Sequence, residues 1–173
     1  MSRTKWITVW IGVAIVGLMG FAYFVNADLK PDKELVRTSD IRGLAHNGFA
    51  KVKGAFSFGF GKNTITNERE FQIGAQLQGP AGSLAGKCYR IVLRDINDAL
   101  NAVSMMRFGP VGSDDFSQVE VLVNGTPDYQ SVVSYLNANA ALMNSGKLEV
   151  IVTEVPCGGG QAGIVNVGRG IIE

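Results

Sequence analysis

A run of twenty residues without a charged side chain lies near the N-terminus, from Trp6 to Val25. As an α-helix this run would rise about 30 Å, which matches the hydrocarbon thickness of a bilayer. Arg3 and Lys5 precede the run, whereas the charges that follow it nearly cancel, so the positive-inside rule predicts a cytoplasmic N-terminus. We therefore expect a single-pass membrane protein whose main domain is periplasmic or extracellular.

Two other interpretations of this run remain open. Residues 25–27 offer a small-x-small pattern for signal cleavage, although the run exceeds the roughly 7 to 15 apolar residues of a signal peptide. A buried helix of a globular domain would show a polar stripe, and this run has none. If the run is a membrane helix, three of its glycines allow a neighbouring helix to pack closely: Gly12, Gly17 and Gly20.

The rest of the chain predicts one domain. About 145 residues follow the run, which is enough for one hydrophobic core. We divide the chain into a transmembrane anchor at 1–27, a stalk at 28–38 and an extracytoplasmic α+β domain at 39–173. The chain has 16 basic and 15 acidic residues without a basic block, so we expect no nucleic-acid partner. The expected partners are membrane lipid and other subunits of a membrane-associated assembly or filament.

Two cysteines, Cys88 and Cys157, both follow the run. An even pair in an exported domain predicts a disulfide, and the alternative is two buried free thiols. Closing so long a loop would stabilise the fold by about 4 kcal/mol in the chain-entropy model. Two cysteines and one distant histidine, His46, lack the spacing of metal ligands, so we predict no metal site.

Hydrophobic periodicity predicts the remaining elements. Apolar residues recur at helical spacing over 84–106, which is the clearest helix outside the membrane. The other expected elements are a helix at 39–52, a hairpin of strands at 56–60 and 71–77, a strand at 119–123, a helix at 128–143, and strands at 148–155, 164–167 and 171–172. We therefore expect an α+β fold, with an N-terminal transmembrane helix followed by a largely antiparallel sheet and packed helices.

No set of catalytic residues can be assembled from the sequence. His46 has no neighbouring Ser, Cys or carboxylate motif. Gly158, Gly160 and Gly163 match the dinucleotide fingerprint GxGxxG, but that motif needs a following helix and none is predicted here. We therefore predict no catalytic residue, no cofactor and no enzymatic activity. Scattered carboxylates keep a membrane-anchored enzyme as a third hypothesis.

Three segments of the outer domain resemble type IVb pilins. One opens an expected helix with the first cysteine, GKCYRIVLRDINDALNAV, and another places the second cysteine in a glycine-rich segment, VPCGGGQAGIVNVG. The third, AFSFGFGKNTITNEREFQIGAQL, is similar to the glycine-rich loop and strand that lead to the first cysteine in that family. The resemblance covers roughly residues 50–168. It implies a non-enzymatic, pilin-like subunit that assembles through its N-terminal helix and is stapled by Cys88 and Cys157.

The chain departs from type IV pilins in its hydrophobic segment. Those proteins carry a glutamate early in the segment, whereas Val25 occupies the corresponding position after Gly20-Phe21. Pro31 also interrupts the long helix of a major pilin. The resemblance therefore implies a minor pilin or a pilin-like accessory protein. The alternative function is a single-pass accessory subunit of another envelope complex, in a secretion or respiratory assembly.

Overall fold

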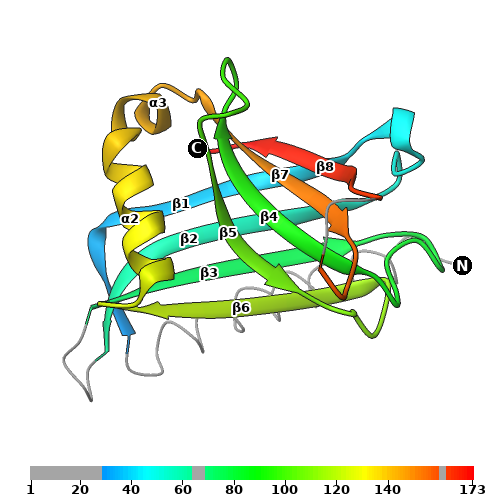
Figure 1. Cartoon of the computed structure of the whole chain (residues 1–173), viewed down its shortest axis with the longest axis horizontal. Coiled ribbons are helices and arrows are strands. Elements are labelled where there is room, and N and C mark those ends of the chain that lie inside the picture. The colour runs from blue at the N-terminus through cyan, green and yellow to red at the C-terminus, as the bar shows by residue number, and fades with distance from the viewer. Residues whose placement is uncertain (1–28, 64–68, 160–162) are drawn as a thin grey trace, which may run out of the picture.

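The structure is a computed structural model that describes residues 29–63, 69–159 and 163–173. The described residues form one antiparallel sheet that curls into a nearly closed barrel (Figure 1). The strands are β1 (Leu29–Gly43), β2 (Lys53–Asn63), β3 (Arg69–Gln78), β4 (Cys88–Asp95), β5 (Ala102–Phe108), β6 (Asp115–Val123), β7 (Leu148–Val155) and β8 (Val165–Ile171). Their order across the sheet is β5-β4-β7-β8-β1-β2-β3-β6, so β5 and β6 are its two edges.

Side chains that alternate along the strands fill the interior of the barrel. Phe60 of β2 pairs with Phe71 of β3, and their ring centroids lie 4.9 Å apart in the edge-to-face geometry that aromatic quadrupoles favour. On the other side of the barrel, Tyr89, Ile91 and Leu93 of β4 are fully buried. Because successive residues of a strand point to opposite faces, the residues between them lie on the outside.

A cluster of three aromatic rings closes the barrel where β5 meets β6. The rings of Phe108 on β5 and Phe116 on β6 lie 5.2 Å apart, and Tyr89 of β4 lies 5.8 Å from each of them. The Tyr89 hydroxyl donates a hydrogen bond of 3.0 Å to the carbonyl oxygen of Leu84, which satisfies the buried phenol. Burial raises the pKa of the Tyr89 hydroxyl well above its usual range, so this group stays a neutral donor.

Helices cover the opening where β5 and β6 diverge. They are α2 (Pro127–Ala138) and the short α3 (Ala140–Asn144). Val132 and Leu136 of α2 are buried in the same core as the strands. The Tyr135 hydroxyl of α2 donates to the carbonyl oxygen of Asn101, at 2.9 Å, in the β4–β5 turn. Figure 1 shows α2 at one end of the barrel, and this contact fixes it there.

The predicted α+β fold with packed helices is wrong, because the described part of the chain is mainly a sheet barrel. The segment 84–106, expected to be a helix, forms β4 and β5. The turn between them is held by the Asp95 and Asp98 carboxylates, which accept backbone N–H bonds from Asn97 and Leu100. Such local bonds compete with helix formation and favour turns. The helical spacing of apolar residues in 84–106 is therefore coincidental.

The helix expected at 39–52 is also wrong. Residues up to Gly43 belong to β1, which also includes residues 29–38 of the predicted stalk. Only the short 3₁₀ helix η1 (Ala45–Asn47) follows, and it ends at Gly48 with φ +84°, a conformation that favours glycine. By contrast, the hairpin predicted from 56–60 and 71–77 is confirmed by the antiparallel pairing of β2 with β3.

The predicted single-pass membrane localisation and the pilin-like architecture need correction. In residues 29–63, 69–159 and 163–173, no helix combines the length and the apolar character needed to cross a bilayer. The structure thus gives the membrane and pilin descriptions no support. The predicted anchor at 6–25, with its packing positions Gly12, Gly17 and Gly20, lies outside the described residues.

The carboxylate of Asp114 organises the loop between β3 and β4. One oxygen, Oδ1, accepts the backbone N–H groups of Leu84 and Ala85 at 2.6 and 3.0 Å, and Oδ2 accepts that of Gly82 at 2.7 Å. These bonds, the one from Leu84 foremost, lower the pKa of Asp114 below its ordinary value of 3.8. Folding therefore favours the charged carboxylate.

We predict that Asp114→Asn destabilises the protein at pH 7 and by less at pH 3. The folded-state pKa of Asp114 is lowered, so its contribution is present above the unfolded pKa and is lost as the pH falls through the folded pKa. Urea unfolding of both proteins at the two pH values measures the difference. Asp115→Asn is the control, because it removes the neighbouring charge and leaves the three loop bonds intact. An equal cost at both pH values would contradict the assignment.

Candidate functional site

The structure joins the two cysteines in a disulfide. The Cys88 and Cys157 sulfurs lie 2.03 Å apart, and their Cα atoms lie 5.2 Å apart. Cys88 begins β4 and pairs with Val155 near the end of β7, so the bond ties the loop after β7 to a strand that already lies beside it. The bond thus holds Cys157, which follows the end of β7, against the start of β4.

The histidine and the glycine motif considered from the sequence form no site in the part of the chain that the structure describes. His46 is exposed in η1, and in the described residues no three His, Cys, Asp or Glu side chains are grouped to hold a metal ion. Gly160 of the predicted motif lies outside the described residues, and the element that follows Gly163 is the strand β8, where a dinucleotide site needs a helix. The predictions of no catalytic residue, no cofactor and no enzymatic activity stay predictions.

The interior of the barrel is filled by large side chains. Phe56, Phe71, Ile73, Tyr89 and Leu93 are each at most 1% exposed and belong to one continuous core. A small barrel whose inward positions are occupied in this way is a packed core, not a ligand cavity. The candidate location of a functional site is therefore the outer face.

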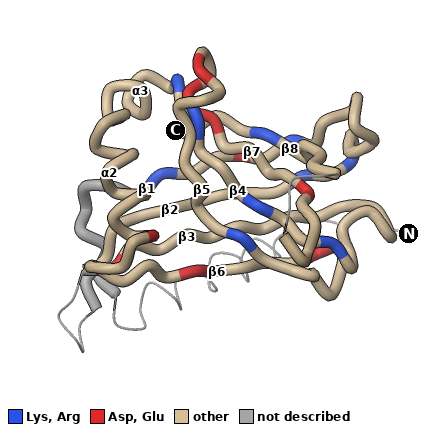
Figure 2. The backbone as a smooth tube through the Cα atoms, viewed as in Figure 1, with Lys and Arg blue, Asp and Glu red and all other residues tan. Residues whose placement is uncertain are grey.

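Arginines from separate strands gather on one outer face of the barrel. Arg90 on β4 lies directly opposite Arg107 on β5, and Arg42 on β1 lies directly opposite Arg169 on β8. Arg94, four residues beyond Arg90 on β4, lies on the same face. We name these five residues the basic face. Figure 2 shows basic positions side by side on β4 and β5.

Acidic residues neutralise little of the positive charge of the basic face. Arg94 donates from Nε to Oε1 of Glu149, which is 4% exposed, at 2.7 Å. Within the part of the chain that the structure describes, Arg42, Arg90 and Arg169 make no ion pair. Like charges directly opposite each other on a sheet destabilise it. The fold therefore tolerates an electrostatic cost on this face, which an anionic partner would relieve.

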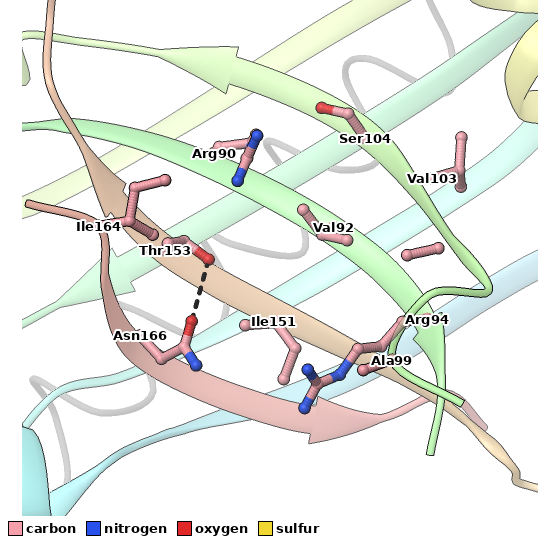
Figure 3. Close-up of a pocket in the computed structure, with 11 residues that line it drawn as sticks. Arg90, Val92, Arg94, Ala99, Val103, Ser104, Ile151, Thr153, Ile164 and Asn166 are labelled. Carbon is pink, nitrogen blue, oxygen red and sulfur yellow. Dashed lines mark hydrogen bonds between the residues drawn. The ribbon is translucent and has the colours of Figure 1, made fainter. Parts of the chain in front are cut away.

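A hollow of about 350 Å³ lies within the basic face, on the outer side of β5, β4, β7 and β8. Figure 3 shows Arg90 and Arg94 toward opposite ends of it, with Val92 and Ile151 between them. Its other lining residues are Ala99, Ala102, Val103, Ser104, Thr153, Ile164 and Asn166. The hollow thus combines an apolar floor with two guanidinium groups, and none of the described residues that line it is a carboxylate.

The basic face could not be recognised in the sequence, because its arginines are far apart along the chain. Arg90 and Arg107 are 17 positions apart, and Arg42 and Arg169 are 127 positions apart, so no run of basic residues marks them. Only the strand register brings each pair together. The one local signal is the alternation of Arg90, Val92 and Arg94, a polar-apolar-polar pattern that is typical of a strand with one exposed face.

A second group of charges lies where β6 approaches α2. Glu120 of β6 pairs with the buried Ile73 of β3, so its side chain lies on the inward face of an edge strand. Burial and the negative charge of Asp128 both raise the pKa of the Glu120 carboxyl. An inward-pointing charge protects an edge strand from pairing with another chain. The charges of Glu120 and Asp128 are therefore explained by the protection of the edge strand β6.

Comparison of the chain with protein-family models, with curated proteins and with solved structures finds no match, so its relationship to the type IVb pilins stays a prediction.

We predict that Arg169→Gln stabilises the protein at low ionic strength. The substitution removes the repulsion with Arg42, and the Arg169 side chain has no hydrogen bond or ion pair in the described structure to lose. The expected gain in the free energy of unfolding is about 0.2–1 kcal/mol, and it shrinks in 0.5 M salt because exposed charges are screened. Urea unfolding at both salt concentrations measures it. Lys51→Gln, an equal charge change in an exposed loop, is the control. A gain that is independent of salt would refute the repulsion.

Proposed function

We propose that this chain is a non-enzymatic interaction subunit that binds an acidic partner protein through the basic face. The observation that carries the proposal is the set of five arginines on one outer face, of which only Arg94 has a carboxylate partner within the described residues. This function keeps the predicted class, a subunit of an assembly, and bases it on the outer surface of the barrel.

Net charge supports a local origin of the attraction. The whole chain carries only +1, so its overall charge gives little affinity for anions. Charges that are concentrated on one face still steer an oppositely charged partner and select its orientation. Binding should therefore depend on the position of a basic residue on the surface and not simply on the total charge.

The chemistry of the face favours a protein partner over a nucleic acid. Proteins that bind single-stranded nucleic acid provide aromatic side chains on which bases stack. The hollow at the centre of the basic face is lined by aliphatic and small polar side chains, without an aromatic ring. An aliphatic floor with arginines beside it suits contact with another protein, because arginine is enriched at protein–protein interfaces.

We predict that the protein binds poly-L-glutamate in 50 mM salt and that Arg169→Glu weakens this binding about fivefold, the loss of a little over one exposed ion pair. Lys51→Glu, the matched control, changes the charge equally but lies on the exposed turn before β2 and should weaken binding less than twofold. Fluorescence anisotropy of a labelled polymer measures both affinities.

Two results would count against the proposed function. If Lys51→Glu weakens binding as much as Arg169→Glu, the attraction depends on net charge and not on the basic face. If the unaltered protein does not bind poly-L-glutamate at 50 mM salt, the face has no function in recognising acidic partners.

A further inference from the structure

Arg90 differs from the other arginines of the basic face in its surroundings. Its Nε atom is buried and has no hydrogen-bond partner among the residues that the structure describes. Its cross-strand neighbours are Arg107 on β5 and Thr153 on β7, so no acidic side chain pairs with it across either strand. A buried polar atom of a charged group is costly to leave unpaired. Arg90 is therefore a donor that lacks its acceptor.

The hollow beside Arg90 is apolar at its floor. Ile151 points outward from β7 yet is only 4% exposed, because the side chains around it rise above the strand. Val92 lies next to it across the β4–β7 pair, and Ile164 lies at the edge of the hollow with 36% of its surface exposed. These three side chains offer an aliphatic contact surface next to the guanidinium of Arg90 (Figure 3).

Polar groups at the rim are weakly engaged. The Thr153 hydroxyl donates to Oδ1 of Asn166 at 3.4 Å, near the limit of a hydrogen bond. Arg94, at the other end of the hollow, is already neutralised by Glu149. The uncompensated charge in the hollow is therefore that of Arg90.

We propose that this hollow binds an acidic residue flanked by aliphatic residues in the partner protein. The carboxylate of that residue accepts hydrogen bonds from the terminal Nη atoms of the Arg90 guanidinium, and the neighbouring aliphatic side chains pack on Val92, Ile151 and Ile164. This inference rests on the proposed function and names the recognition element. The hollow, at about 350 Å³, lies at the small end of the roughly 300–1,000 Å³ of ligand pockets, which suits a short side-chain motif.

The mixed character of the hollow excludes simpler ligands as its best fit. A free phosphate would use Arg90 and leave the aliphatic floor without a partner. An uncharged aliphatic peptide would use the floor and leave the guanidinium charge of Arg90 without a carboxylate. Only a ligand that supplies both groups satisfies the whole hollow.

The test uses the short peptide acetyl-Val-Glu-Val-amide as the probe. Methyl NMR spectra of the protein should show saturable shifts at Val92, Ile151 and Ile164. Acetyl-Val-Gln-Val-amide and inorganic phosphate, tested in the same way, should each bind at least about tenfold more weakly, which is the scale of one charge-assisted hydrogen bond. Equal binding of either ligand would overturn the proposal.

Two variants separate the charge from the floor. Arg90→Gln should weaken binding of the glutamate peptide at least about tenfold, because it removes the guanidinium. Val92→Thr keeps the β-branched shape on β4 but adds a hydroxyl to the floor, and should weaken binding about threefold. Lys51→Gln, outside the hollow, is the control and should change the affinity less than twofold. If neither Arg90→Gln nor Val92→Thr weakens binding, the peptide binds elsewhere and the inference is wrong.

The outcomes also separate this inference from the proposed function. One possible result is that the protein binds poly-L-glutamate through Arg169 but the hollow does not bind the glutamate peptide. In that case the basic face recognises acidic partners without using the hollow, and only this inference fails. If neither probe binds, both fail. The unfolding transition of each variant, compared with that of the unaltered protein, shows that any loss of binding occurs in a folded protein.

Discussion

The ring contacts of Tyr89, Phe108 and Phe116 are the constraint on which this fold depends. They join the two edges of the sheet, β5 and β6, where the strand order provides no backbone pairing. Aromatic contacts are less directional than a ladder of hydrogen bonds, so the two strands can meet at one end and diverge at the other. The helix α2 fills the divergent end with Val132 and Leu136. Because side-chain contacts close the barrel only where β5 and β6 meet, the helix α2 is needed to cover the end where the two strands diverge.

Described side chains fill the interior of this barrel, and the recognition that we propose therefore uses its outer surface. The same register that buries Tyr89, Ile91 and Leu93 presents Arg90 and Arg94 outside, four positions apart on one strand. Antiparallel pairing then places cations of neighbouring strands opposite each other, at a cost in stability. The core and the candidate site are thus two faces of one alternating pattern, and a change of register in β4 would destroy both.

The sequence predicted the elements in which one structural pattern dominated. The strand at 148–155 matches β7, and the helix at 128–143 corresponds to α2 and α3, which are separated at Asn139. The prediction was wrong for 84–106, because apolar residues on two short strands and their turn imitate helical spacing, and that error also supported the pilin-like fold. The basic face was not predictable from local sequence, because its pairs come from distant strands. The disulfide between Cys88 and Cys157 was inferred from their number and expected compartment alone, and the structure joins them.

We propose that this protein recognises an acidic partner on the outside of a filled barrel. The most direct measurement is the footprint of poly-L-glutamate on the protein, recorded as chemical-shift changes for every residue during a titration. We expect changes at outward residues of β4, β5, β7 and β8, Arg90 and Val92 among them, and unchanged ring signals for the interior residues Phe56 and Phe71. Shifts concentrated on those interior rings, with the outer face unaffected, would contradict the account.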